Sequence, residues 1–324
     1  MSKRKTINPA LLAEINKAAG RDKEVETPVV SFDEAVESFL NHGVIKGLSP
    51  DTVASYQKEL KQLRRAFAEL NVGLSDIRNL TTDDYTAFVM NQIEAGFART
   101  TINTRLRSGK IFGNYCVRKG FIDVNVASEV ATLKVRHKIG ATFTQAQLKR
   151  LLSEPDISTF SGLRDLTIMM MFTDTGIRVS ELAAINMQDV ILSDRSLNLQ
   201  RTKNRYARRI PLTKRLQAML TAYMKVRGVT DLTDALFITE ADTRLAVITI
   251  QYRIRLHGRN AGVINEVQCS PHVFRRSFAK FKIQAGVDIF TLQKLMGHSD
   301  INELRKYVAI YSTDLDAAIE KGIE

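Results

Sequence analysis

The chain has 324 residues, 44% hydrophobic and 25% charged, a length that suits two domains and a composition that excludes wholesale disorder. Its 47 Lys and Arg outnumber its 35 Asp and Glu, and the net charge of +12 favours a nucleic acid partner over a basic protein without one, because side chains that neutralise phosphates release condensed counterions. No apolar run is long enough to span a bilayer, the start lacks a signal-peptide core, and the two cysteines have no zinc-binding spacing, so we expect a cytoplasmic protein with reduced thiols and no membrane partner.

The first elements are an arm and two helices. Residues 1–28 are polar and contain two prolines, and we expect them to form a flexible arm. A helix should begin after Ser31, because its hydroxyl and the carboxylate of Glu34 can form a capping box. Ser49-Pro50 repeats a start signal, with proline at the first helical position, and the apolar residues that follow recur every three or four positions.

Two further helices are expected at residues 81–96 and 100–119, and Gly120 stands where helices commonly stop. Together with the first two they form a helical domain over residues 29–122. The fourth helix carries a cluster of basic residues, which we interpret as DNA-binding candidates, with a solvated helix face as the alternative. These residues are Arg99, Arg105, Arg107 and Lys110.

Residues 123–140 lose the helical period and are interpreted as an exposed basic linker. Its DNA-binding candidates are Lys134, Arg136 and Lys138. A second domain, residues 141–324, opens with a capping box of Thr144 and Gln147. It should be helical apart from short β-compatible runs. These runs lie at 190–192, 197–199 and 208–211. The expected fold is therefore mainly α with one small antiparallel sheet.

The first of five chemical features is the run Thr175-Gly176-Ile177-Arg178-Val179-Ser180-Glu181-Leu182. A glycine turn precedes Arg178, and Ser180 or Thr175 can cap the helix that follows. Arg178 and Glu181 are three residues apart and should interact.

The other four features follow in order along the chain. Lys203 is predicted at the tip of a hairpin between two strands. His272 and Arg275 lie one turn apart at the start of a helix, where a guanidinium can bind phosphate oxygens. His298 follows Gly297, which is expected to end a helix, and Tyr307 lies nine residues later, with Tyr311 beyond it.

This set of side chains suits attack on a phosphodiester. The cations can stabilise a pentacovalent phosphorane, the lysine can protonate a leaving 5′-oxygen, and a histidine can manage the proton of the nucleophile. A tyrosine is a poor nucleophile at neutral pH unless positive neighbours favour its anion. The sequence has neither metal-ligand spacing nor a Walker loop, so we expect cleavage without metal, ATP or cofactor.

In these motifs the chain resembles the tyrosine recombinases, or phage-type integrases, over about residues 30–320. The resemblance implies that Arg178, Lys203, His272, Arg275, His298 and Tyr307 are catalytic, with Tyr307 as nucleophile and Glu181 as a supporting residue. It also implies a core-binding domain of SAM-like fold over residues 29–122 and a catalytic domain of the DNA breaking-rejoining type.

Further properties follow from the resemblance. They are a 3′-phosphotyrosine intermediate, a Holliday junction, a homotetramer on two sites of double-stranded DNA, and a role in DNA integration, excision or resolution, as for mobile genetic elements. A tail helix over residues 312–324 is expected to dock on a neighbouring protomer or on its own domain. Because no arm-binding domain fits in 28 residues, a two-domain Xer-like or transposon-type member is expected.

Alternatives remain open at the sequence level. The segment before Tyr307 lacks the Thr-Thr pair common in the family, so Tyr311 is a rival nucleophile. A type IB topoisomerase-like activity would use the same chemistry, whereas an accessory DNA-binding protein or an RNA-binding protein would not need the full set. The sequence does not show the target site, the direction of recombination or the host element. It also does not show whether a partner recombinase or bending factor is needed, or which residues read bases.

Overall fold

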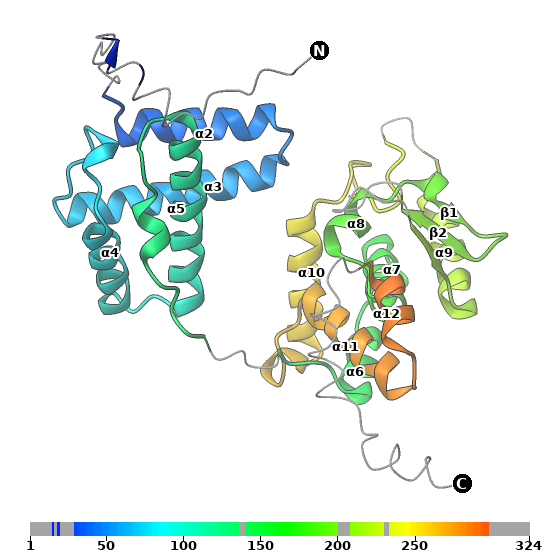
Figure 1. Cartoon of the computed structure of the whole chain (residues 1–324). Helices are drawn as coiled ribbons and strands as arrows, with labels where there is room; N and C mark the ends of the chain where they lie inside the picture. Colours follow the sequence, from blue (N-terminus) through cyan, green and yellow to red (C-terminus); the bar gives the residue numbers. More distant parts are fainter. Residues whose placement is uncertain are drawn as a thin grey trace, which may run out of the picture. The chain divides into compact units, whose positions relative to one another are not determined.

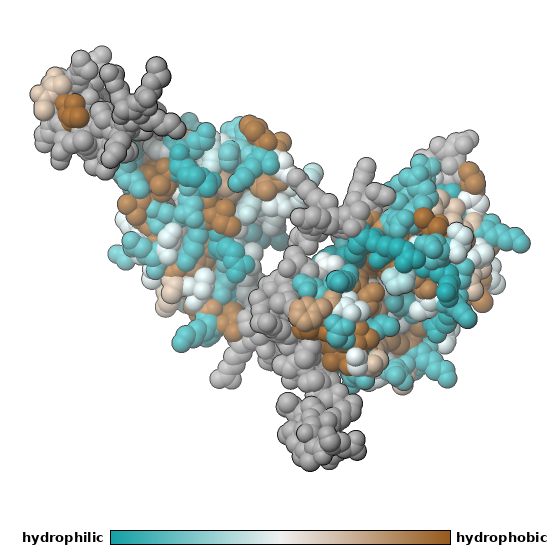
Figure 2. Space-filling view, turned by 45° about the vertical axis from the view of Figure 1, so that its right-hand side comes forward, coloured by the Kyte–Doolittle hydropathy of each residue, from teal (hydrophilic) through white to brown (hydrophobic). Residues whose placement is uncertain are grey.

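The computed structural model describes residues 15, 18–19, 29–135, 140–199, 208–229 and 233–297. The chain divides into two compact units, Met1–His137 and Lys138–Glu324 (Figure 1), and each contains its own hydrophobic core. On the face shown in Figure 2, hydrophobic residues lie between hydrophilic ones on both units. Among the described residues, no helix is long and apolar enough to cross a membrane.

The described part of the first unit is helical. Its elements are α2 (Phe32–Ile45), α3 (Pro50–Glu69), η1 (Ile77–Asn79), α4 (Thr82–Glu94), α5 (Arg99–Lys119) and η2 (Val126–Glu129). α5 packs against α2, α3 and α4. The core between them is aromatic: Phe32 meets Phe67 and Phe112 edge to face, with ring centroids 6.1 and 5.3 Å apart, a geometry that aromatic quadrupoles favour.

The predicted helix limits of the first unit are confirmed. Ser31 and Glu34 form both bonds of the capping box before α2, and Ser49 caps α3 with Pro50 at its first position. Gly120 ends α5 with φ of +70°, a left-handed conformation that is strained for residues with a Cβ atom. Local capping chemistry therefore sets these boundaries.

The linker predicted over residues 123–140 is wrong for its first half. Ala127 and Val130 are buried in the core of the first unit, and η2 packs on α5. Asn125 is also buried, and its Nδ2 donates to the carbonyl of Lys110 on α5 at 2.9 Å. The helical period disappears because the backbone forms a 3-10 turn rather than because it leaves the core.

The second unit is mainly α around a small sheet. Its helices are α6 (Gln145–Ser153), α7 (Phe160–Thr175), α8 (Val179–Ala184), η3 (Met187–Asp189), α9 (Lys214–Arg227), α10 (Val247–Asn260), η4 (Val263–Asn265), α11 (Pro271–Gln284) and α12 (Ile289–Met296), and its strands are β1 (Val190–Ile191), β2 (Ser196–Leu199) and β3 (Arg208–Pro211). The strands form an antiparallel sheet in the order β1-β2-β3. This confirms the predicted fold class.

Helix α7 is the central element of the second unit. It packs against α6, α9, α10 and α11, and the run from Met169 to Phe172 is buried on all sides. A helix that is apolar all round is stable only in a core. The C-terminal end of α7 therefore has a fixed position, and the next residues after it belong to the candidate site.

A buried ionic network joins α7 to α6 and α10. Asp165 on α7 pairs with Arg164 at 2.9 Å, with Arg253 at 2.5 Å and with Nε2 of His257 at 3.0 Å. The Nδ1 of His257 contacts Glu154. Burial disfavours charge on His257, but the hydrogen bonds to Asp165 and Glu154 outweigh this effect and raise its pKa.

Candidate active site

Arg178 and Glu181 interact at the start of α8. Arg178 is the N-cap, and its backbone N–H and its Nη1 both donate to the Glu181 carboxylate, at 3.0 and 2.9 Å. Glu181 is 3% exposed. The predicted pair is therefore confirmed as a contact, but the predicted cap by Ser180 or Thr175 is wrong, because Glu181 caps the helix and the Thr175 hydroxyl donates to the carbonyl of Met171.

Gly176 makes the turn between α7 and α8. Its φ is +59°, and a Cβ atom at this position would lie 2.4 Å from Cδ1 of Phe278 on α11. Its carbonyl accepts a hydrogen bond from Nη1 of Arg275 at 2.5 Å. Glycine is thus required twice here, for backbone conformation and for space, and the close approach brings Arg275 to the turn that precedes Arg178.

Arg178 and Arg275 meet at the C-terminal end of α12. Nη2 of Arg178 donates to the carbonyl of Gly297 at 2.9 Å, and Nη2 of Arg275 donates to the carbonyl of Met296 at 2.8 Å. The last carbonyls of a helix have no partner within it and attract cations. Because these two carbonyls are consecutive, both guanidinium groups lie at the same end of α12.

A third arginine, Arg208, belongs to the site and was not predicted as a site residue. Its Nη2 and Nη1 donate to Glu181 at 2.8 and 3.2 Å. Its side chain is 12% exposed, and its pKa is lowered by desolvation and by the charge of Arg178, against the attraction of Glu181. Strand alternation is the signal that could have found it, because Arg208 shares a face with the buried Ile210.

His272 lies in the first turn of α11 and is exposed, one turn before the buried Arg275. Partial burial of its ring lowers its pKa, and the positive charges of Arg276 and Arg275 lower it further. Arg276 donates from Nε to the carbonyl of Ala141 at 3.0 Å. Both effects favour the neutral imidazole of His272, which is the form that can accept a proton.

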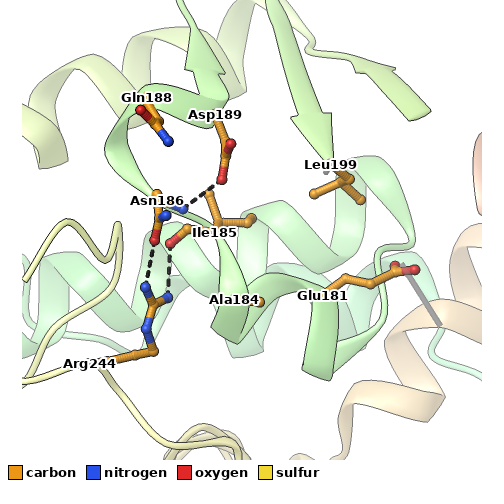
Figure 3. Close-up of a pocket in the computed structure, with 8 residues that line it drawn as sticks. All are labelled: Glu181, Ala184, Ile185, Asn186, Gln188, Asp189, Leu199 and Arg244. Atoms are coloured by element: carbon orange, nitrogen blue, oxygen red, sulfur yellow. Dashed lines mark hydrogen bonds between the residues drawn. The ribbon is translucent and has the colours of Figure 1, made fainter. Parts of the chain in front are cut away.

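A pocket next to Glu181 shows how the other end of α8 is fixed (Figure 3). Arg244 donates from Nη1 to the carbonyls of Ala183 and Ile185, at 2.8 and 3.3 Å, and from Nη2 to Asn186 Oδ1 at 2.5 Å. The short helix that carries Arg178 and Glu181 is thus held at both ends. Preorganisation of this kind is what a site for a charged transition state needs.

Several predicted site residues lie outside the described residues. They are Lys203, His298, Tyr307 and its rival Tyr311, the basic residues Arg136 and Lys138, and the tail helix predicted at 312–324. The described residues contain no group of three or more His, Cys, Asp or Glu that could hold a metal ion. The site brings together Arg178, Glu181 and Arg275, with His272 beside Arg275.

The basic candidates of the first unit differ in their surroundings. Arg105 is 8% exposed, and its Nε lies 3.6 Å from Oε2 of Glu59. Its Cζ lies 4.3 Å from the centroid of the Phe97 ring. A side chain held in this way makes internal contacts within the first unit, and the role of Arg105 in binding phosphate stays a prediction. Arg107 is exposed.

Three candidates border the segment that follows α5. Lys110 donates to the carbonyl of Val130 at 2.7 Å, and Arg99 donates to the carbonyl of Lys134 at 3.1 Å. Arg99 and Lys134 are exposed, whereas Lys110 is half-buried. Each of these bonds uses one donor atom of a longer side chain, so Arg99 and Lys134 remain candidates for DNA contact, and Lys110 also supports η2.

Two family models match the chain. The model of the phage integrase family matches residues 141–313, and the model of the phage integrase N-terminal SAM-like domain matches residues 36–120. Among similar proteins, tyrosine recombinase XerC of Chlamydia pneumoniae is 27% identical, over 85% of this chain and 94% of its own length. Tyrosine recombinase XerD of Shewanella oneidensis is 26% identical, over 86% of this chain and 92% of its own.

Solved structures share the fold. An integrase of the Tn1549 transposon, in complex with a circular intermediate DNA, covers 90% of this chain and 99% of its own, with a TM-score of 0.71 and 18% identity. A lambda integrase dimer bound to a COC′ core site covers 93% of this chain and 81% of its own, with a TM-score of 0.70 and 16% identity.

Proposed function

The chain belongs to the phage integrase family, and on this premise we propose that it is a tyrosine-type site-specific recombinase that cleaves and rejoins duplex DNA. The relatives that are named tyrosine recombinases align along 85% and 86% of the chain. The observation that carries the proposal is the convergence of two arginines. Arg178 and Arg275, 97 positions apart in the sequence, donate to the consecutive carbonyls of Gly297 and Met296.

We assign Arg178 and Arg275 to the scissile phosphate. Each guanidinium can present two parallel N–H groups to phosphate oxygens, and such charge-assisted bonds are stronger than neutral ones. Both groups are aimed before substrate arrives, Arg178 by Glu181 and Arg275 by the carbonyl of Gly176. Donors that are already oriented stabilise the phosphorane without reorganisation during the reaction.

The proposed reaction needs no cofactor. The phenolic oxygen of Tyr307 attacks the phosphorus, forms a 3′-phosphotyrosine bond and displaces the 5′-oxygen of the next nucleotide. Lys203 gives a proton to that leaving oxygen. His272, whose pKa is lowered by partial burial and by the neighbouring arginines, accepts the proton of the tyrosine, and His298 is assigned to the phosphate. Rejoining is the reverse reaction with a 5′-hydroxyl from the partner strand.

We further propose that four protomers act on two DNA sites and exchange strands through a Holliday junction in the cytoplasm, with the tail helix 312–324 as a link between neighbours. The candidates for phosphate contact are Arg99, Arg105, Arg107, Lys110, Lys134 and Arg136 of the first unit and Lys138 of the second. The balance of 47 basic to 35 acidic residues supports a polyanionic partner of this kind.

The test is to trap the covalent intermediate. Wild type, Tyr307→Phe and Tyr311→Phe proteins would be incubated with nicked suicide duplexes taken from DNA that flanks the gene, and protein–DNA adducts that resist SDS would be mapped by mass spectrometry. We expect an adduct that is lost only in Tyr307→Phe. Loss only in Tyr311→Phe would move the nucleophile, and preferential binding of RNA over duplex DNA would contradict the proposed function.

A further inference from the structure

We propose that Arg208 is a positioning residue for DNA cleavage, which acts on the phosphate-binding Arg178 through the carboxylate that they share. This inference rests on the proposed function, because it gives Arg208 a part in the same reaction. Arg208 is the first residue of β3 and pairs with Leu199 of β2. The antiparallel register therefore fixes where its backbone lies.

The Glu181 carboxylate is saturated by two arginines. Oε1 accepts from Nη1 of Arg178 and from Nη1 of Arg208, and Oε2 accepts from the backbone N–H of Arg178 and from Nη2 of Arg208. Glu181 is only 3% exposed, so these arginine donors supply hydrogen bonds that bulk water does not reach. Without Arg208, half of the hydrogen bonds to the carboxylate are lost, and Glu181 is free to turn further towards Arg178.

Charge gives Arg208 its second effect. Arg178 and Glu181 alone form a neutral pair, which attracts a phosphate weakly. With Arg208 the group contains two cations and one anion, so a net positive charge remains to face the developing charge of a phosphorane. The carboxylate thereby orients Arg178 without neutralising the site.

The burial of Arg208 is unfavourable for folding, which favours a functional reason for it. Its Nε is buried and has no hydrogen-bond partner among the residues that the structure describes, and a second cation, Arg178, competes for the same carboxylate. Buried charges with incomplete hydrogen bonding usually destabilise a protein relative to apolar residues of the same size. Functional sites are where such features are retained.

Arg208 also contacts the end of α12. A Cβ atom built on Gly297 would lie 1.7 Å from Nη1 of Arg208, so the guanidinium lies directly against this glycine. The carbonyl of the same glycine accepts from Arg178. Arg208 therefore touches both anchors of Arg178, the carboxylate and the end of α12.

The next residue supplies a matched control. Arg209 lies on the other face of β3, and its Nη2 contacts Asp194 at 3.0 Å, with side-chain exposures of 55% and 63%. Arg208→Met and Arg209→Met remove the same charge and keep a similar chain length one position apart. Only the first of them removes a donor to Glu181.

The experiment measures three quantities on full-length protein: single-turnover adduct formation on a suicide duplex, the dissociation constant for the same duplex, and the melting temperature. The variants are Arg208→Met, Arg208→Lys, Arg209→Met, Glu181→Gln and the double variant Glu181→Gln/Arg208→Met. We expect Arg208→Met to slow adduct formation about tenfold to a hundredfold, as small misplacements of catalytic groups do, with DNA affinity changed less than about threefold.

Rescue and coupling separate positioning from folding. Arg208→Lys should recover part of the rate, since it restores the charge without the second donor. Arg208→Met should have a smaller effect when Glu181 is already Gln, because no carboxylate charge then needs balancing. Arg209→Met should match wild type in all three quantities.

Two results would overturn the inference. The first is normal adduct formation by Arg208→Met. The second is a loss of rate that accompanies a fall in melting temperature, that Arg208→Lys does not recover, and that is equally large in the Glu181→Gln background. Failure of the proposed function has a different signature. In that case the wild type forms no adduct that depends on Tyr307, whatever residue stands at position 208.

Discussion

Gly297→Ala tests the geometry of the site through protein stability. Gly297 ends α12 with φ of +62°, and an added Cβ would lie 1.7 Å from Nη1 of Arg208. Alanine at this position therefore meets two obstacles, the left-handed backbone and the guanidinium. Gly286, with φ of +76° and no atom of the described residues within 4 Å of an added Cβ, meets only the first and is the matched control.

The two obstacles have separate magnitudes. A left-handed residue with a Cβ atom costs roughly 1–2 kcal/mol, and this is the loss of unfolding free energy expected for Gly286→Ala. In Gly297→Ala the Nη1 atom must also move, which breaks its bond to the Glu181 carboxylate. A hydrogen bond to a charged group contributes about 1.5–3 kcal/mol, so Gly297→Ala should lose roughly 1.5–3 kcal/mol more than the control.

The assay is equilibrium urea unfolding of the two alanine variants, each in the wild-type and in the Arg208→Met background. The excess loss at Gly297 should disappear once Arg208 is Met, because a methionine side chain can move without breaking an ion pair. Equal losses for Gly297→Ala and Gly286→Ala, or an excess that persists with Met at 208, would refute the contact between Arg208 and Gly297.

Three further predictions concern catalysis and pH. Arg178→Ala or Arg275→Ala should abolish adduct formation and leave site binding within a few-fold in a gel-shift assay; normal turnover in either would remove the phosphate-binding assignment. EDTA should not slow strand cleavage on a suicide duplex, and a divalent ion requirement in that step would contradict the mechanism. Folding raises the pKa of His257. Its ion pairs with Asp165 and Glu154 therefore stabilise the fold fully when the pH is below the pKa of the histidine in the unfolded chain. This stabilisation is lost as the pH rises through the pKa of the histidine in the folded protein. The free-energy difference between wild type and His257→Gln should therefore shrink from pH 6 to pH 9, and a constant difference would argue against a charged histidine.

Helix limits in this chain are predictable because their chemistry is local. The capping box at Ser31 and Glu34, the proline after Ser49 and the left-handed Gly120 involve residues at most three positions apart. The pair Arg178 and Glu181 is equally local. Sequence spacing alone is enough to predict such local features. It does not predict which carbonyls at the end of α12 accept hydrogen bonds from Arg178 and Arg275.

The buried ion pairs of Arg105 and Arg208 could not be predicted from the sequence, for a common reason. Arg105 lies on the inward stripe of α5, three residues after the buried Ile102, and Arg208 lies on the inward face of β3 with Ile210. The sequence periodicity places both side chains at inward positions. A charged side chain at such a position is stable only when a buried partner of opposite charge lies beside it. Those partners, Glu59 for Arg105 and Glu181 for Arg208, lie 46 and 27 positions away.

The tight turn at Gly176 affects how genetic screens of this protein are interpreted. A library of random substitutions scored only by loss of recombination would rank position 176 beside the reactive residues, although a glycine contributes no reactive group. The ring of Phe278 and the left-handed backbone make any side chain at this position unfavourable. Measuring the amount of soluble protein for each variant would show whether a loss of recombination at position 176 comes from failed folding, since a spatial clash lowers the yield of folded protein.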